Sequence, residues 1–345
     1  MPNHATQFFD NKTYKLLLDS SNMAENKGIS VIIPIYGDFD IKRALLCVNS
    51  IKAQKGVDIE IVISEQGIAR RFPEIEGVKH IFTYHKPKAN LSDFNPGKIR
   101  NIAIVNSNKD FIYTLDADTI FADPLFLKKL LGYLIKHPNK ILYRPFMRRL
   151  PADNFEEFNK WYSSLGFKKA VKKLIINQNF LVKTSPGYRE LKIFEKISKE
   201  AGYKKTFTSL IEDYKKYVDE RIGSDTEFNF WPVYWNENRH CGSNFFRRTH
   251  FLNVGGYCER FVNWGCEDSD LQWKFREMYD LEFFPSSFEV IHLDHPKEYL
   301  SPKMWDLNEK KSTERKSKGV KSAIKYDKKI LKKEYGKQLE AMKNL

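Results

Sequence analysis

Short apolar runs alternate with amphipathic segments over the first part of this chain. Residues 29–36 form an apolar, β-branched run that predicts a buried strand. Residues 40–53 carry apolar side chains at helical spacing, and residues 58–64 predict a second strand. A strand, a helix and a strand in this order predict a parallel sheet with helices on its faces, and so an α/β fold.

The alternation continues beyond the second strand. Further strands are predicted at 78–84, 111–115 and 141–143, with helices at 97–105 and 124–136. Parallel sheets of this kind bind ligands beyond the carboxyl ends of their strands. Asp116 and Asp118 directly follow the predicted strand 111–115, so we expect a ligand site there.

The second half of the chain is organised differently. Lys/Glu-rich helical periodicity over 151–221 predicts a helical insertion, and the sheet is expected to resume near 230–235. Residues 271–278 predict a helix and residues 281–292 an extended segment. We therefore divide the chain into a leader (1–28), one α/β domain (29–300) and a basic helical tail (301–345).

The net charge of +14 is concentrated at the C-terminal end. Residues 301–345 hold 14 Lys/Arg against 6 Asp/Glu, which is +8 of the total. A basic tail of this kind favours phosphate, either on anionic lipid or on nucleic acid. A solvated helix is the equally simple alternative.

Cysteine content and hydropathy indicate a compartment. Four cysteines without paired spacing indicate reduced thiols, as in a cytosol. The polar first 28 residues resemble neither a signal peptide nor an anchor, and no apolar window is long enough to cross a membrane. We expect a cytoplasmic protein. If it binds a membrane, we expect it to bind peripherally to the inner face of the plasma membrane.

Two clusters of carboxylates carry the chemistry. Asp116 and Asp118 end a predicted strand, where hard oxygen ligands suit Mg²⁺ or Mn²⁺ and, through the cation, a diphosphate. About 150 residues later, Glu267, Asp268 and Asp270 follow Trp264. These acids are either a catalytic cluster or the acidic first turn of a helix, which the helix dipole favours.

Several segments resemble known transferases, and they follow one another in the same order as in those transferases. Residues 31–36 and the triplet 116–118 are similar to the opening strand and the metal motif of family 2 glycosyltransferases of the GT-A fold. Residues 94–101 resemble the Phe-Asn-x-x-Lys-x-x-Asn stretch of β-1,4-galactosyltransferases. Residues 241–244, 255–257 and 264–270 are similar to the C-terminal galactosyltransferase module, with its Trp-Gly-x-Glu-Asp-x-Asp pattern.

The resemblance implies a GT-A domain with a nucleotide-sugar-binding half (29–123) and an acceptor half (230–300). It implies an inverting, metal-dependent transfer of a hexose or N-acetylhexosamine from a UDP-sugar to a glycan hydroxyl, with Mn²⁺ or Mg²⁺. Asp268 would be the general base, with Glu267 beside it. The implied donor contacts are Pro34, Tyr36, Glu65, Lys98, Arg100 and Asp116. The implied acceptor contacts are Trp264, Gly265 and Glu267, and the implied metal ligands are Asp118, Asp116 and His292.

Some points stay open. His295 competes with His292 as metal ligand, because both lie in one short segment. Pro96 stands where the galactosyltransferases carry Arg, and Cys241-Gly242 replaces their Gly-Gly, so the donor sugar is open. We expect a lipid-linked or other glycan acceptor in the synthesis of a bacterial surface polysaccharide.

Three other functions compete with this prediction. Retaining N-acetylgalactosaminyltransferases share a similar segment, although they carry Asn where this chain has Asp268. A silent module that binds sugar nucleotide or glycan would keep the motifs without turnover. Nucleic-acid binding would suit the basic tail but leaves the ordered carboxylates unexplained, so no nucleic-acid partner is expected.

Overall fold

A computed structural model gives the fold of the chain. It describes residues 28–37, 39–86, 94–177, 180–181, 239–263, 265–285, 287–295 and 302–341. The expected strand near 230–235, Trp264 and most of the expected insertion, from residue 182 to 221, lie outside these residues.

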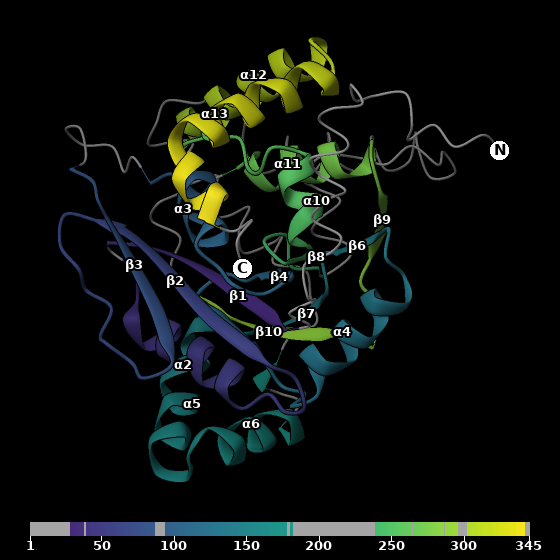
Figure 1. Ribbon diagram of the computed structural model, residues 1–345. Coiled ribbons are helices and arrows are strands. Elements are labelled where there is room, and N and C mark those ends of the chain that lie inside the picture. Colours follow the sequence, from purple (N-terminus) through teal and green to yellow (C-terminus); the bar gives the residue numbers. More distant parts are fainter. Residues whose placement is uncertain are drawn as a thin grey trace, which may run out of the picture.

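The main sheet contains the predicted βαβ core. Among the described residues its strand order is β3-β2-β1-β4-β8-β6-β9 (Figure 1). In chain order the strands are β1 (Ile29–Tyr36), β2 (Ile59–Gly67), β3 (Val78–Tyr84), β4 (Phe111–Thr114), β6 (Lys140–Tyr143), β8 (Asn244–Arg247) and β9 (Asp280–Phe283). The first four run parallel to one another, whereas β8 lies antiparallel to β4 and to β6. The expected mostly parallel α/β sheet is confirmed.

Alternating side chains of β1 pack against helices on both faces of the sheet. Ile33 joins one core cluster with α2 and α4, and Ile32 joins another with α3, α10 and α11. The bounds of these helices are α2 (Ile41–Lys52), α3 (Pro96–Val105), α4 (Phe126–Lys136), α10 (Arg248–Asn253) and α11 (Glu267–Arg276). Burial on both faces explains why the strand reads as a continuous apolar run.

Side-chain caps fix the start of two of the predicted helices. Asp40 accepts a hydrogen bond from the backbone N–H of Lys42, at the start of α2. Asn95 accepts one from Lys98 N–H at 2.8 Å, and Pro96 occupies the first turn of α3. These are the residues that favour a helix N-terminus, so the start of α3 next to the sheet is set locally.

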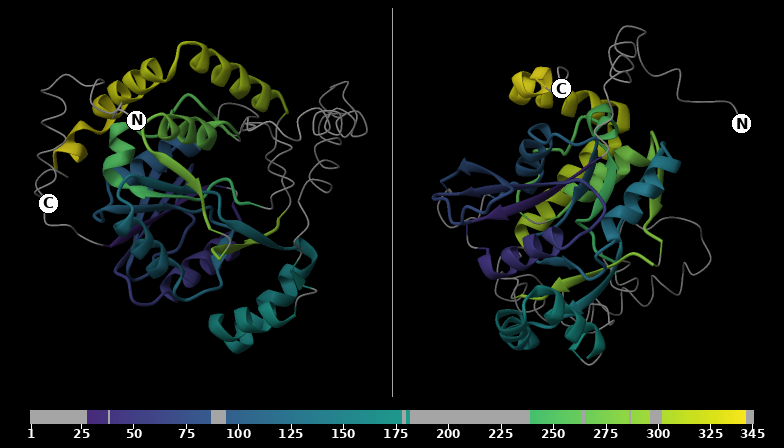
Figure 2. Two further views of the ribbon diagram at one scale, coloured as in Figure 1. Left: turned by 90° about the vertical axis from the view of Figure 1, so that its right-hand side faces the viewer. Right: turned by 60° about the horizontal axis from the view of Figure 1, so that its bottom comes forward.

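A second, smaller sheet was not predicted. Its strands are β5 (Thr119–Phe121), β7 (Phe146–Leu150) and β10 (Glu289–Leu293), with β10 in the centre. The helices α5 (Ala152–Leu165) and α6 (Phe167–Ile176) pack beneath it through Phe158 and Leu174 (Figures 1 and 2). The segment expected to be extended over 281–292 is therefore two strands, β9 and β10, that belong to different sheets.

The basic C-terminal segment is helical and packs on the domain. Helices α12 (Pro302–Ser317) and α13 (Val320–Ala341) lie on the opposite side of the molecule from α5 and α6 (Figure 2). Leu331 and Tyr335 of α13 pack against Val105 of α3. No helix in the described part of the chain combines the length and the apolar character needed to cross a membrane.

Candidate active site

Asp116 lies at the carboxyl end of β4, as the sequence predicts. Ile32 of β1 pairs with Thr114 of β4, so Asp116 stands two residues beyond this pair. Its Oδ1 accepts from Arg100 Nη2 at 2.8 Å, and its Oδ2 lies 3.3 Å from His240 Nε2. Although burial opposes ionisation, His240 and Arg100 lower the pKa of the Asp116 carboxyl.

Gly242 makes room for the Asp116 carboxylate. A Cβ atom at this position would lie 2.4 Å from Asp116 Oδ2, closer than any side chain allows. The Gly242 carbonyl also accepts from the Thr114 hydroxyl at 2.9 Å, which ties the loop before β8 to the end of β4. Cys241-Gly242, which replaces the Gly-Gly of the galactosyltransferases, thus retains the glycine that the Asp116 carboxylate requires.

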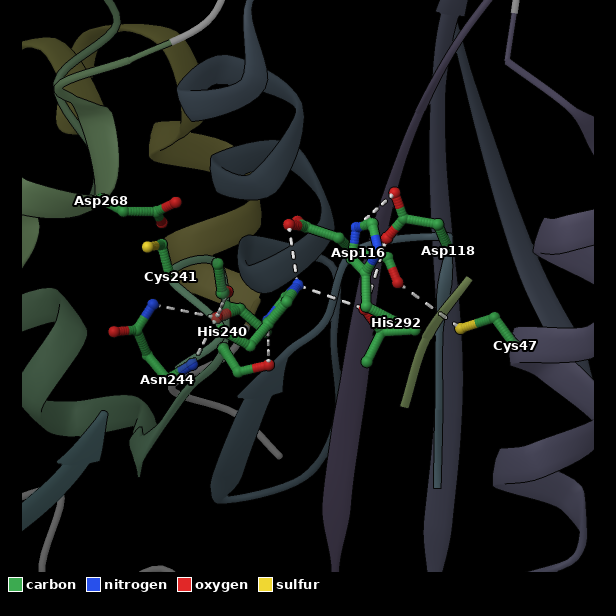
Figure 3. Close-up of polar contacts among 12 residues, drawn as sticks. Cys47, Asp116, Asp118, His240, Cys241, Asn244, Asp268 and His292 are labelled. Atoms are coloured by element: carbon green, nitrogen blue, oxygen red, sulfur yellow. Dashed lines mark hydrogen bonds and ion pairs between the residues drawn. The ribbon is translucent and has the colours of Figure 1, made fainter. Parts of the chain in front are cut away.

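Two imidazoles lie against Asp118. His292 Nε2 is 3.3 Å and His295 Nε2 is 2.9 Å from Asp118 Oδ2 (Figure 3 shows His292). Pairing of β10 with β5 places His292 opposite Thr119, and Leu293 N–H donates to the Asp118 carbonyl at 2.7 Å. Burial opposes ionisation of Asp118, but the two imidazoles hold the pKa of its carboxyl well below its usual range.

Asp294 orients His292. The ring Nδ1 of His292 lies 2.8 Å from Asp294 Oδ1, and Arg149 pairs with the same carboxylate at 2.7 Å. A proton on Nδ1 would leave Nε2 facing Asp118 as an acceptor, which is the arrangement found behind metal-binding histidines. Burial opposes ionisation of Asp294, yet His292 and Arg149 lower the pKa of its carboxyl to about 2.

Three groups of side chains in the described residues have donor atoms within 4.8 Å of one another, as a metal site requires. Two of the groups share Asp118: one contains His292 and His295, and the other contains Asp116 and His240. The third, Cys258 with Asp270 and Asp327, already has its carboxylates paired with Lys274 and Arg315. The first two are therefore the candidate metal positions.

One guanidinium joins the two carboxylate clusters. Arg100, which is 4% exposed, contacts Asp116 at 2.8 Å, Glu267 Oε1 at 3.2 Å and Asp268 Oδ1 at 3.9 Å. Glu267 and Asp268 lie in the first turn of α11. The acidic first turn of a helix and the candidate catalytic cluster are therefore the same residues. The Asp268 carboxylate points toward the side of the site that holds Asp116 (Figure 3). Groups about 150 residues apart in sequence therefore form one site.

The environment of Asp268 suits proton transfer near neutral pH. Its Oδ1 lies 3.3 Å from the Tyr257 hydroxyl. Burial raises the pKa of Asp268, Arg100 opposes the rise, and Glu267 adds to it, with a net value of about 7. A carboxylate with a pKa near the working pH is well matched to the task of a general base.

Sequence comparison agrees with this geometry. A family model described as "Glycosyl transferase family 2" matches residues 30–198, and one described as "N-terminal domain of galactosyltransferase" matches residues 226–296. The two matches contain both carboxylate clusters, so the family matches and the site coincide. The chain therefore carries a family 2 glycosyltransferase domain. Its mixed α/β architecture is that of GT-A glycosyltransferases.

Similar solved structures come from Staphylococcus aureus TarS. The TarS 1–349 complex with UDP has a TM-score of 0.42 and 14% identity, and the match covers 78% of this chain and 61% of that one. The complex with UDP-GlcNAc has a TM-score of 0.40 and 13% identity, covering 79% and 60%. The chain thus spans about three fifths of the TarS 1–349 chain. Comparison with curated proteins finds no match.

The other predicted donor contacts have different surroundings. Tyr36, partly buried, ends β1 and packs on Phe94 with ring centroids 4.8 Å apart. Pro34 is buried within β1. Lys98 is half-buried on α3, and side chains two positions apart on a helix do not face each other, so it does not share the Arg100 contacts.

Contacts within the protein already engage the Glu65 side chain. Its side chain is fully buried and accepts from the backbone N–H groups of Arg71 and Phe72 at 2.8 and 3.3 Å. These bonds hold the loop that follows β2. A direct contact of Glu65 with the donor stays a prediction.

The predicted acceptor contacts are only partly described. Gly265 has φ +104°, and a Cβ atom on it would lie 2.5 Å from the Trp305 ring of α12. One side of Gly265 is therefore covered by the C-terminal helices. Trp264 lies outside the described residues, so its role toward the acceptor stays a prediction.

Two residues of the candidate site, His240 and Tyr257, were not predicted from the sequence. His240 Nε2 lies 3.1 Å from the Thr119 hydroxyl and its Nδ1 lies 2.8 Å from Ser243 Oγ, in addition to its contact with Asp116. Tyr257 contacts Asp268. Both stand beside segments that carry the resemblance: His240 directly precedes Cys241, and Tyr257 closes the Gly-Gly-Tyr triplet. That adjacency was the available signal.

Proposed function

We propose that this glycosyltransferase transfers a hexose or N-acetylhexosamine from a UDP-sugar to a hydroxyl of a glycan acceptor, with a divalent cation and with inversion. Asp268 is the general base in this proposal. The single observation that carries it is the Arg100 guanidinium, which contacts Asp116 on one side and Glu267 and Asp268 on the other. A donor held at the strand end would then lie beside a carboxylate that can deprotonate the acceptor.

The residues around Asp118 fit a divalent cation. Asp118, His292 and His295 offer a carboxylate and two imidazoles with donor atoms within 4.8 Å of one another. Asp294 supports His292 from behind, as such ligands require. Of the two expected ions, Mn²⁺ suits this mixed oxygen and nitrogen set better than Mg²⁺, which prefers oxygen ligands. When bound, the cation would neutralise charge on the diphosphate leaving group.

The protein side chains have separate tasks in this proposal. Asp268 accepts the proton of the attacking hydroxyl at a carboxylate oxygen, while Arg100 and Tyr257 hold that carboxylate in place. Tyr36, at the end of β1, would border the uracil. Attack on an α-linked donor from the opposite face would give a β-linked product.

The rate of transfer should depend on the ionisation of Asp268. The base acts only when deprotonated, and its pKa is raised to about 7, so activity is present above this pH and lost below it. Between about pH 8 and about pH 6 we expect kcat to fall about tenfold. Initial rates at saturating substrates, in buffers of constant ionic strength, check this. A profile that is flat over that range would argue against Asp268 as the base.

Donor binding can be tested without knowing the acceptor. Thermal unfolding with UDP-, GDP- and dTDP-sugars, each with and without Mn²⁺, should show stabilisation by the UDP-sugars that depends on Mn²⁺. A ligand at 100 times its Kd stabilises the folded state by about 2.7 kcal/mol. Equal stabilisation by all three nucleotides, or by none, would remove the support for a UDP-sugar donor.

We also propose that the exposed face of α13 contacts an anionic membrane surface. Lys325, Lys329 and Lys332 are exposed and lie three or four positions apart, so they share one face of the helix. The exposed ring of Tyr326 lies beside them. Each lysine near an anionic surface contributes about 1 kcal/mol, which favours peripheral attachment of this side of the molecule.

Replacing these three lysines with glutamine should weaken binding to phosphatidylserine vesicles by roughly 100-fold, since the lost attraction is about 3 kcal/mol. Vesicle sedimentation measures this. The control removes the same charge from α6, with the exposed Lys168, Lys169 and Lys172 changed to glutamine, because α6 lies at the opposite end of the molecule from α13 (Figure 1). An equal loss in both variants would indicate binding through net charge instead of through α13.

A further inference from the structure

The loop that leads into α11 has an unusual backbone. Asn263, Gly265 and Cys266 all have positive φ, at 61°, 104° and 73°. Glycine adopts this region freely and asparagine tolerates it, whereas a residue such as Cys266 remains there when the surrounding structure holds it. Glu267 and Asp268 follow immediately, so whatever holds this loop also sets the direction of the proposed base.

Helix α12 holds the loop. Asn308 is fully buried, and its Nδ2 donates to the Val262 carbonyl at 2.8 Å and the Gly265 carbonyl at 3.3 Å. Its Oδ1 accepts from Val262 N–H at 3.4 Å. Lys311, one turn further on, donates to the Arg260 carbonyl at 2.8 Å. The two side chains therefore bind main-chain groups of three loop residues.

Buried charges attach the same helix pair to α11. Arg315 of α12 donates through Nε and Nη2 to both oxygens of Asp270, at 2.8 and 3.1 Å, and pairs with Asp327 of α13 at 2.7 Å. Lys274 of α11 donates to Asp327 at 2.6 Å. All four side chains are 4% exposed or less, and their charges balance. Buried ion pairs are weak evidence for stability, but their fixed geometry can specify orientation.

We infer that α12 is a positioning element of the active site and that Asn308 is its main positioning residue, holding the loop at 262–266 so that Asp268 faces the donor side. The inference rests on the proposed function of Asp268. It also gives the C-terminal segment a task distinct from membrane contact, because Asn308 and Arg315 lie on its buried face while the lysines of α13 lie on its exposed face.

The test compares Asn308→Ala with Thr313→Ala, an exposed position on the same helix. Three quantities are measured: deuterium exchange of the 258–272 segment, Kd for UDP with Mn²⁺, and kcat for transfer. Asn308→Ala should speed exchange of this segment and lower kcat by about 10- to 100-fold, because small displacements of a catalytic group cost that much. Its Kd for UDP should stay within about twofold of wild type, since the proposed donor residues lie elsewhere. Thr313→Ala should resemble wild type in all three.

Several outcomes would overturn the inference. One is faster exchange with unchanged kcat, and another is a parallel loss of UDP binding and kcat, as general destabilisation would give. If Asn308→Ala does not fold, Lys311→Met serves instead, and unchanged exchange and kcat in that variant would likewise count against α12. A wild-type protein without transferase activity would contradict the proposed function alone, because the exchange result would still report whether α12 holds the loop.

Discussion

Asp268→Asn should lower kcat for glycosyl transfer by about 10²- to 10⁴-fold, the usual contribution of a general base. Asparagine has nearly the same shape, and it cannot accept the proton of the acceptor hydroxyl. The variant should bind UDP normally, because Asp118 and His292 are unchanged. Release of UDP in the presence of a glycoside acceptor measures the rate, and calorimetry measures the affinity.

The control for this variant is Asp280→Asn, which removes an exposed carboxylate from the edge strand β9. It should keep full activity. Unchanged turnover in Asp268→Asn would refute the role of Asp268. A loss of UDP binding that matches the loss of rate would mean that the substitution disturbs the site and does not remove a base.

Asp118→Ala should abolish the dependence of donor binding on Mn²⁺. Asp118 is the carboxylate shared by both candidate metal groups, so its removal leaves only imidazoles around one position and Asp116 with His240 at the other. Loss of a supporting contact behind a ligand already costs about 10- to 100-fold in metal affinity, and loss of the ligand should cost at least as much. Titration of UDP with and without Mn²⁺ gives the affinity directly.

Wild-type protein treated with chelator should behave like Asp118→Ala, whereas Asp280→Ala should behave like untreated wild type. Circular dichroism and the midpoint of thermal unfolding report whether Asp118→Ala folds. Full transfer activity in chelator would count against a metal. If donor binding by Asp118→Ala still depends on Mn²⁺, the metal site does not include Asp118.

The parts of the fold that sequence predicted are those with long, regular patterns. The strand at 29–36 is apolar on both faces because helices cover both, and its bounds were predicted to the residue. Strand β5 has only three residues, too few for periodicity to identify. Strand β8 begins with Asn244 and ends with Arg247, so it lacks the continuous apolar run that predicted the equally short β4. The partition of 281–292 between two sheets depends on contacts with β6 and β7, about 140 residues earlier.

The sequence predicted the two clusters of carboxylates in the candidate site, but it could not predict which side chains contact each other. Three acids at 267–270 are equivalent in sequence, but folding places Asp268 near Arg100 and buries Asp270 against Arg315. That separation depends on a helix about 45 residues later. His240 lies in a loop without periodic pattern, and its approach to Asp116 is a tertiary contact across more than 120 residues. The charge of the tail indicated an exposed surface, while its buried face carries Asn308 and Arg315.

The most direct test of the account is the crystal structure of the protein with UDP and Mn²⁺. We expect the cation beside Asp118 and His292, the uracil next to Tyr36, and the β-phosphate on the side of Asp116 that the Asp268 carboxylate faces. Nucleotide bound at a different sheet edge, or with its diphosphate remote from both Asp116 and Asp268, would contradict the claim that the two carboxylate clusters serve one transfer site.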